Sequence, residues 1–99
     1  MAKKGMRLEK GTRQKIVSIL KKNGVDRAGI FGSYAKGTAG KKSDIDLLIK
    51  FRGEKSLLDL SGLKIELEEN IKKKVDLVTY RSVHPLLKES ILKGEVRIL

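Results

Sequence analysis

The segment from Asp44 to Phe51, DIDLLIKF, carries two carboxylates at a spacing that suggests metal chemistry. Asp44 and Asp46 are separated by one residue, so on a β-strand they lie on one face, about 6 to 7 Å apart. Mg²⁺ binds one or two such carboxylates and takes its other ligands from water and phosphate. Two ions about 3.5 to 4 Å apart can stabilise both oxygens of a phosphoryl displacement. A capped turn entering a strand would use the same residues, so the pair alone does not decide.

The dipeptide Gly32-Ser33 comes directly after the segment from Val25 to Phe31, which is apolar at both ends. This order predicts a strand that ends at a tight backbone position, followed by a short helix. Backbone amides at a helix start, together with a serine hydroxyl, form a cradle for phosphate, and glycine allows close approach. An ordinary tight turn would use the same two residues, so this motif is also weak by itself.

Asp76 supplies a third carboxylate near the start of another apolar segment, VDLVTY, from Val75 to Tyr80. A carboxylate in such a strand needs a partner or access to water. If the two strands are parallel neighbours joined by a helix, they begin at the same edge of the sheet, and Asp76 lies beside Asp44 and Asp46. The strand that ends before Gly32 reaches this edge only if it runs antiparallel. If the three aspartates and Gly32 belong to one site, the sheet must therefore contain both parallel and antiparallel neighbours.

Taken in order, GSYAKGTAGKKSDIDLLI resembles the signature of the polymerase-β-type nucleotidyltransferases, in particular their minimal (MNT) branch. That pattern comprises Gly-Ser, a basic residue and Gly, a variable loop, Ser-Asp-x-Asp-Leu and a later apolar-Asp-apolar strand. The resemblance implies a metal-dependent transfer from a nucleoside triphosphate, with Asp44 and Asp46 as ligands of Mg²⁺ or Mn²⁺. It also implies that Asp76 completes the metal site and helps to activate the incoming hydroxyl.

The same resemblance assigns nucleotide binding to four residues. Gly32 and Ser33 are expected to hold the β- and γ-phosphates, and Ser43 and Lys36 are expected to contribute to nucleotide binding. Lys36 departs from the family, which more often has arginine at this place. Both residues are cations, but lysine lacks the bidentate fork of arginine, so Lys36 serves either on phosphate or in a structural pair.

The acceptor is implied only by the resemblance. Minimal relatives frequently form two-component modules with a HEPN-family protein, whose tyrosine hydroxyl receives AMP from ATP. The transfer silences the HEPN ribonuclease toxin, so the nucleotidyltransferase acts as an antitoxin, and this is the leading expectation here. Two alternatives remain open: a non-catalytic binding module that neutralises its partner by occlusion, and a basic nucleic-acid-binding domain.

Composition narrows the class of protein. With 99 residues, the chain is expected to form one nucleotidyltransferase domain over residues 1–99. It has no cysteine, and no apolar run approaches the roughly 20 residues that cross a bilayer, so a cytoplasmic protein without a membrane span is expected. The net charge of +11 predicts an anionic partner, but an aromatic content of 4% offers little stacking surface for single-stranded nucleic acid.

Hydrophobic periodicity predicts the elements that position these residues. The expected fold class is α/β (α+β), a small mixed β-sheet of three to four strands packed against helices, which the resemblance identifies with the polymerase-β-type nucleotidyltransferase fold. Helices are expected over residues 7–22, 33–38, 56–74 and 82 to about 93, strands over 25–31, 44–51, 75–80 and 96–99, and a loop over 37–42.

Ser33 and Ser82 are expected to cap helices, and His84 to be a surface or capping residue rather than a catalytic base. In the loop, Lys41 and Lys42 either meet the triphosphate or form a solvated tip.

Overall fold

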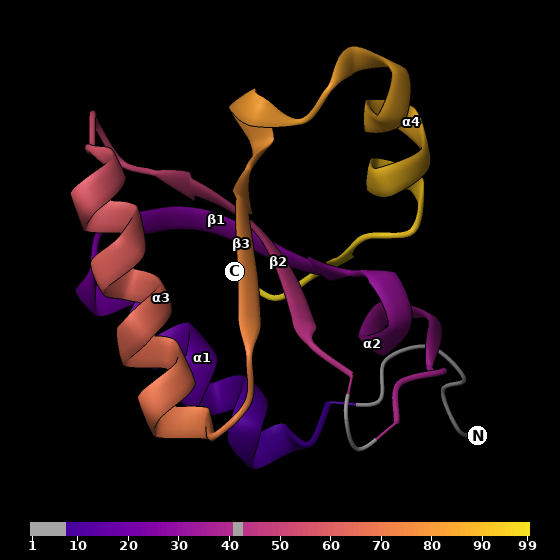
Figure 1. Ribbon diagram of the computed structural model, residues 1–99, viewed down its shortest axis with the longest axis horizontal. Helices are drawn as coiled ribbons and strands as arrows, with labels where there is room; N and C mark the ends of the chain where they lie inside the picture. Colours follow the sequence, from indigo (N-terminus) through magenta and orange to yellow (C-terminus); the bar gives the residue numbers. More distant parts are fainter. Residues whose placement is uncertain (1–7, 41–42) are drawn as a thin grey trace.

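The structure is a computed structural model that describes residues 8–40 and 43–99 of the chain. Its elements are α1 (Lys10–Lys22), β1 (Val25–Phe31), α2 (Gly32–Lys36), β2 (Ile45–Phe51), α3 (Leu57–Ile71), β3 (Val75–Thr79), the 3-10 helix η1 (Tyr80–Ser82), α4 (Pro85–Lys93) and β4 (Val96–Arg97). Figure 1 shows α1 and α3 together on one side of the strands, with α2 and α4 towards the other. In the described part of the chain, no helix combines the length and apolar character needed to cross a membrane.

The described strands form a mixed sheet in the order β3-β2-β1-β4. Strand β1 runs antiparallel to β2, whereas β2 and β3 are parallel and are joined by α3. Strand β4 adds a short antiparallel edge beside β1 and covers Val96–Arg97 rather than residues 96–99. The predicted mixed sheet and its fold class are therefore confirmed, including the parallel pair and its antiparallel neighbour.

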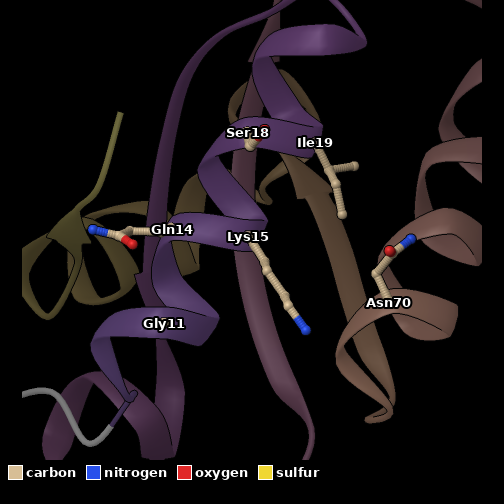
Figure 2. Close-up of a pocket in the computed structure, with 6 residues that line it drawn as sticks. All are labelled: Gly11, Gln14, Lys15, Ser18, Ile19 and Asn70. Carbon is tan, nitrogen blue, oxygen red and sulfur yellow. The ribbon is translucent and has the colours of Figure 1, made fainter.

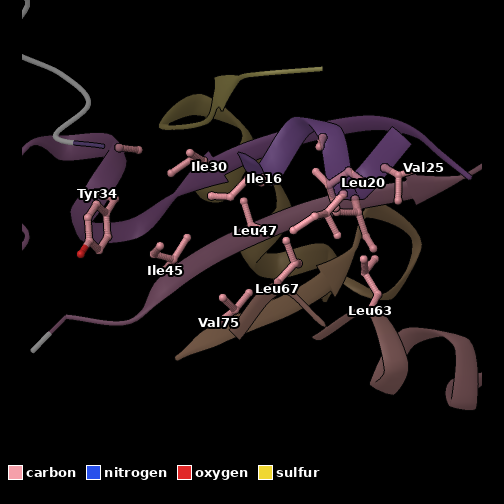
Figure 3. Packing of buried hydrophobic residues seen from close by; sticks show 14 of the residues in the cluster. Ile16, Leu20, Val25, Ile30, Tyr34, Ile45, Leu47, Leu63, Leu67 and Val75 are labelled. Atoms are coloured by element: carbon pink, nitrogen blue, oxygen red, sulfur yellow. The ribbon is translucent and has the colours of Figure 1, made fainter. Parts of the chain in front are cut away.

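The hydrophobic core lies between the sheet and the helices α1 and α3 (Figure 3). It includes residues of both helices and alternate residues of β2: Ile16, Leu20, Leu63, Leu67, Ile45, Leu47 and Ile49. Each of these side chains is at most 1% exposed, and burying one stabilises the fold by about 1.5 to 3 kcal/mol. Because side chains alternate across a strand, Asp46 and Leu48 face the other side of the sheet.

Each of the four predicted helices is shorter than its expected range, and α2 ends at Lys36 rather than at residue 38. The helix expected over 7–22 begins at Lys10. Helix α3 begins after Ser56, which caps it, but ends at Ile71 rather than at residue 74. The reason is Lys72, whose left-handed φ of 59° ends the helix and turns the chain towards β3. This turn sets the position from which β3 enters the sheet.

Both predicted serine caps are wrong. Helix α2 begins one residue earlier than Ser33, at Gly32, and its N-cap residue makes no side-chain capping bond. Ser82 belongs to η1, and α4 begins at Pro85. His84 is the N-cap residue of α4, because its Nδ1 accepts a hydrogen bond from a backbone N–H of the first turn at 3.1 Å. The prediction that His84 is a capping residue is therefore confirmed, and it agrees with proline at the first helical position.

Candidate active site

Asp46 and Asp76 lie side by side at the edge of the sheet where β2 and β3 begin. The parallel register pairs Asp46 with Asp76. On the other side of β2, the antiparallel register pairs Asp46 with Phe31, the last residue of β1. The end of β1 therefore meets the beginnings of β2 and β3, as one common site requires. Both aspartates occupy strand positions that face away from the core between α1 and α3.

Two hydrogen bonds hold the start of β3 in this register. Ile45 N–H donates to the carbonyl oxygen of Lys74 at 3.0 Å. Val75 N–H donates to Oε2 of Glu68, a residue in the last turn of α3, at 2.8 Å. These bonds fix the residues on either side of the turn between α3 and β3. Asp76 is therefore opposite Asp46 rather than opposite a neighbouring residue of β2.

Gly32 makes a close approach possible between the start of α2 and Asp46. Its φ is +74°, in the left-handed region that favours glycine. A Cβ atom at residue 32 would lie 2.3 Å from Oδ2 of Asp46, so the carboxylate occupies the space that a side chain would need. Glycine is therefore required here for Asp46 as well as for an approaching phosphate. The sequence alone predicts only the second requirement.

Helix α2 carries two further residues predicted to bind the nucleotide, Ser33 and Lys36. Buried Tyr34 and Ala35 anchor this short helix in the core. Ser33 is partly exposed, and its carbonyl oxygen accepts a hydrogen bond from Thr38 N–H at 2.9 Å. Lys36 is exposed in the last turn of the helix. The structure thus brings Ser33 next to Gly32 at the site, while Lys36 lies one turn further away.

Asp44 and Ser43 lie just before β2, because the strand begins one residue later than predicted. Asp44 is exposed, and its negative charge acts on Asp46. The hydroxyl oxygen of Ser43 accepts a hydrogen bond from Gly40 N–H at 2.9 Å, which closes the end of the loop. The expected contribution of the loop lysines, residues 41–42, lies outside the described residues.

Partial burial and the neighbouring carboxylates raise the pKa of Asp46 to about 6. Partial burial has the largest effect, followed by the hydrogen bond with Asp76 and then by the negative charges of Asp76 and Asp44. Within residues 8–40 and 43–99, no three His, Cys, Asp or Glu side chains are close enough to enclose a metal ion by themselves. The carboxylate pair still fits Mg²⁺, which takes its remaining ligands from water and phosphate.

Lys73 is a cation at this end of the sheet to which the motif assigned no role. Its Nζ lies 5.9 Å from the centroid of the Tyr34 ring, so the turn before β3 contacts α2. Sequence reasoning placed Lys73 only near the C-terminal end of a helix. Its position three residues before Asp76 is the signal that could have associated it with the site.

A separate hollow lies between α1 and α3. It has a volume of about 380 Å³ and is lined by the residues drawn in Figure 2: Gly11, Gln14, Lys15, Ser18, Ile19 and Asn70. The described residues that line it include no carboxylate and none of the predicted site residues. The hollow therefore has no part in the arrangement around Asp46.

Comparisons with known proteins identify the family of the chain. Residues 14–99 match the family model described as polymerase beta, nucleotidyltransferase. A Methanocaldococcus jannaschii protein, provisionally named a protein adenylyltransferase, is 55% identical over 87 residues, which cover 88% of this chain and 94% of the relative. Protein adenylyltransferase MntA of Thermococcus cleftensis is 36% identical over 75 residues, which cover 76% of each chain.

Two solved structures share the fold. A toxin–antitoxin structure with AMP-PNP contains a chain of 26% identity and TM-score 0.79, and the match covers 88% of this chain and 72% of that one. A complex of tri-AMPylated Shewanella oneidensis HEPN toxin with MNT antitoxin contains a chain of 22% identity and TM-score 0.75, with coverage of 93% and 72%. Together with the match over residues 14–99, these findings show that the chain is a nucleotidyltransferase of the polymerase beta family.

Proposed function

We propose that this nucleotidyltransferase transfers AMP from ATP to a tyrosine hydroxyl of a HEPN-family toxin and thereby acts as the antitoxin. The observation that carries the proposal is the Asp46–Asp76 pair, held against Gly32 where β1 ends. Two adjacent carboxylates repel each other unless a proton or a cation lies between them, which suits the binding of a metal–triphosphate complex. The acceptor class is supported by the similarity to a protein adenylyltransferase and to a chain of a toxin–antitoxin structure.

In this proposal the carboxylates hold the metal ion. Asp44, Asp46 and Asp76 are the proposed ligands of Mg²⁺, for which Mn²⁺ is an alternative. The bound ion would neutralise phosphate charge and make the phosphorus more electrophilic. Support comes from the donor set itself: the two paired aspartates are oxygen ligands of the kind that Mg²⁺ prefers, and Asp44 adds negative charge nearby.

The phosphate side of the proposed site begins at Gly32. Gly32 and Ser33 are proposed to bind the β- and γ-phosphates through backbone amides and the serine hydroxyl. Lys36 and Ser43 are proposed to complete nucleotide binding from the end of α2 and from the loop before β2. Ser43 lies two residues before β2, which supports its part in this division, because a triphosphate must contact both the cradle and the metal ion.

The chemical step is an in-line attack by the acceptor oxygen on the α-phosphorus of ATP. A bond forms between that oxygen and the phosphorus, the bond from the α-phosphorus to the bridging oxygen breaks, and pyrophosphate leaves. The hydroxyl proton is lost in the same step, and we assign its acceptance to Asp76. Positioning of the reactants and neutralisation of charge then supply most of the rate enhancement.

The proposal extends to the setting of the enzyme. We infer that residues 1–99 act as one nucleotidyltransferase domain and that the acceptor belongs to another molecule. The core supports this, because its buried cluster joins α1, α3 and the central strands. A cytoplasmic location is proposed because ATP is available there and a chain without cysteine needs no oxidising compartment.

The substitution Asp46→Asn tests the transfer directly. The assay contains labelled ATP, Mg²⁺ and the HEPN-family protein encoded beside this chain. Loss of one carboxylate of the pair is expected to slow labelling by about a thousandfold, or about 4 kcal/mol in the barrier. Asp26→Asn is the matched control, because Asp26 is an exposed aspartate near the opposite end of β1. Circular dichroism and thermal melting establish that both variants fold.

Two results would replace this function with an alternative. If the wild-type chain binds the HEPN protein without labelling it, and the Asp46→Asn variant binds equally well, the chain acts by occlusion. A chain that instead binds single-stranded nucleic acid, with affinity that falls steeply with salt and survives Asp46→Asn, is a nucleic-acid-binding domain.

A further inference from the structure

The ends of β2 and β3 opposite the aspartates open into a groove. It has a volume of about 1090 Å³ and is bordered by the start of α3, by η1 and by α4. Its apolar lining consists of Ile49, Phe51, Leu57, Leu60 and Leu92. Figure 1 shows this region between the start of α3 and α4, away from α2. Among the described residues that line the groove, none belongs to the proposed nucleotide or metal site.

Most charged residues of the groove are cations. The lysine and arginine residues in its lining are Arg27, Lys50, Lys55, Arg81 and Lys88. Glu54 is the acidic residue among the described residues that line it. Lys55, Arg81 and Lys88 are all exposed at the surface. The groove therefore favours an occupant with negative charge.

One wall of the groove is held by contacts within the protein. The guanidinium of Arg27 lies 4.6 Å from the centroid of the Tyr80 ring and 3.9 Å from the carboxylate of Glu95. The hydroxyl of Tyr80 donates a hydrogen bond to the same carboxylate. Because Glu95 balances the charge of Arg27, the positive field of the groove comes mainly from the exposed cations of η1, α4 and the loop before α3.

Large apolar side chains are exposed on both helices that border the groove. Leu57 and Leu58, at the start of α3, are 81% and 83% exposed, and Leu86 in α4 is 85% exposed. None of the described residues of α4 is buried, although the helix has nine residues. A helix of this length gains little stability from propensity alone, so its leucines need another surface to pack against. Of these exposed leucines, Leu57 lines the groove, where an exposed apolar side chain favours an interaction surface.

We propose that this groove docks an amphipathic helix of the protein partner, with its apolar stripe against the leucines and its acidic residues towards Lys55, Arg81 and Lys88. The inference rests on the proposed function, because it assumes that the chain acts on a protein. Nucleic acid would use the same cations, but leucines offer no ring on which a base can stack. An acidic amphipathic helix satisfies both the leucines and the cations, which is why it is the occupant that the groove fits.

The position of the groove separates docking from transfer. From Asp46 to Phe51 the strand β2 extends over roughly 16 Å, so the groove and the aspartates lie at opposite ends of the same strand. Substitutions in the groove can therefore change affinity for the partner while the nucleotide site stays intact.

The first test measures the affinity for the co-encoded HEPN-family protein in the absence of ATP. A groove variant combines three charge reversals: Lys55→Glu, Arg81→Glu and Lys88→Glu. A matched variant makes the same change in charge at exposed positions of α1 and α3 outside the groove: Lys15→Glu, Lys21→Glu and Lys64→Glu. The Kd is expected to rise at least tenfold in the groove variant and less than threefold in the matched variant. Both variants should still bind ATP with Mg²⁺.

A second pair of variants tests the apolar part of the surface. Leu57→Ser removes an exposed leucine that lines the groove, and Ile65→Ser removes an apolar residue of α3 that is 55% exposed and lies outside it. Leu57→Ser is expected to raise the Kd at least fivefold, and Ile65→Ser to leave it unchanged. Amide hydrogen exchange in α4 should slow when the partner binds, because the exposed helix becomes covered.

The outcomes separate the docking proposal from the transfer function. Equal affinity of the groove and matched variants overturns docking at the groove, and continued labelling of the partner leaves the transfer function standing. Groove-dependent binding without labelling supports docking and overturns transfer. A chain that does not bind the HEPN protein at all overturns docking, whatever its activity. If a single-stranded oligonucleotide displaces the partner and does not bind the groove variant, the groove is a nucleic-acid surface. That result also overturns the proposal.

Discussion

Two regions beside β2 each hold a carboxylate against a glycine. Where β2 begins, a Cβ on Gly32 would lie 2.3 Å from Asp46, and beside the middle of β2, where Gly29 pairs with Leu48, a Cβ on Gly29 would lie 1.9 Å from Glu95. The surroundings of the two acids differ. Glu95 accepts a hydrogen bond from Tyr80 and faces a guanidinium, whereas Asp46 is paired with a second aspartate.

This difference distinguishes an acid whose charge is balanced within the protein from one that we propose to bind a metal ion. The charge of Glu95 is balanced within the protein, so its contacts stabilise the fold. The charge of Asp46 meets another negative charge, so its burial is costly until a cation or proton arrives. Adjacent unbalanced carboxylates are therefore better evidence for a ligand site than burial of a single acid.

Of the two glycine substitutions that test this comparison, Gly32→Ala is expected to have the larger effect on transfer. An alanine Cβ would displace the Asp46 carboxylate, and the φ of +74° costs a residue with a side chain about 1 to 2 kcal/mol. Displacing one carboxylate of the pair is expected to lower kcat/KM by about a hundredfold or more. Initial rates of partner labelling, corrected for the folded fraction, measure this.

The control for that change is Gly11→Ala. A Cβ at residue 11 meets no heavy atom within 4 Å, and the residue lies in α1. Alanine there should stabilise the protein by up to about 1 kcal/mol and leave transfer unchanged. If both variants lose transfer equally, the contact between Gly32 and Asp46 has no special role.

Gly29→Ala is expected to reduce stability rather than chemistry. The new Cβ would move Glu95 away from Tyr80 and Arg27, with a loss of about 1 to 3 kcal/mol in the free energy of unfolding. Urea denaturation measures the loss, and labelling per folded molecule should match the wild type. A Gly29→Ala protein of normal stability that cannot transfer AMP would show that the regions around Glu95 and Asp46 are coupled.

Tyr80 is expected to make the groove end sensitive to alkaline pH. Partial burial, followed by the hydrogen bond to Glu95, raises the pKa of Tyr80 from 10.0 to about 12. In this window the unfolded chain loses the phenol proton and the folded protein keeps it. The associated stability is therefore present below pH 10 and is lost as the pH rises towards 12. Denaturation curves across this range should show the wild type losing stability relative to Tyr80→Phe; parallel curves would contradict the assignment.

Leu57→Ala should have the smallest effect on stability. The side chain is 81% exposed, so the free energy of unfolding should change by no more than about 0.5 kcal/mol. In the same helix, Leu63 is 1% exposed, and Leu63→Ala should cost about 2 to 5 kcal/mol. Thermal melts of the two variants compare the open groove with the core. A large loss in Leu57→Ala would mean that this leucine packs within the chain and is not part of a docking surface.

Elements with strong local signals were predictable from the sequence. The segment at residues 25–31, apolar at both ends, became β1 with the predicted bounds, and the apolar residues of 44–51 identified the next strand to within one residue. Helix boundaries were less predictable. Gly32 allows α2 to begin before Ser33, and the sequence does not show that its φ is positive. Lys72 likewise ends α3 in a conformation that is uncommon for lysine.

The sequence by itself determined the fold class, the family and the identity of the acids, because strand periodicity and a helical crossover require only local patterns. Only the tertiary structure decided which acids have their negative charge balanced by neighbouring groups. Asp46 meets Asp76 across thirty residues of chain, and Glu95 meets Tyr80 across fifteen. Such neighbours depend on strand register and side-chain packing, which bring distant residues within hydrogen-bond distance. For that reason Gly32 lies against an acid that is paired with a second acid, whereas Gly29 lies against an acid whose charge is balanced.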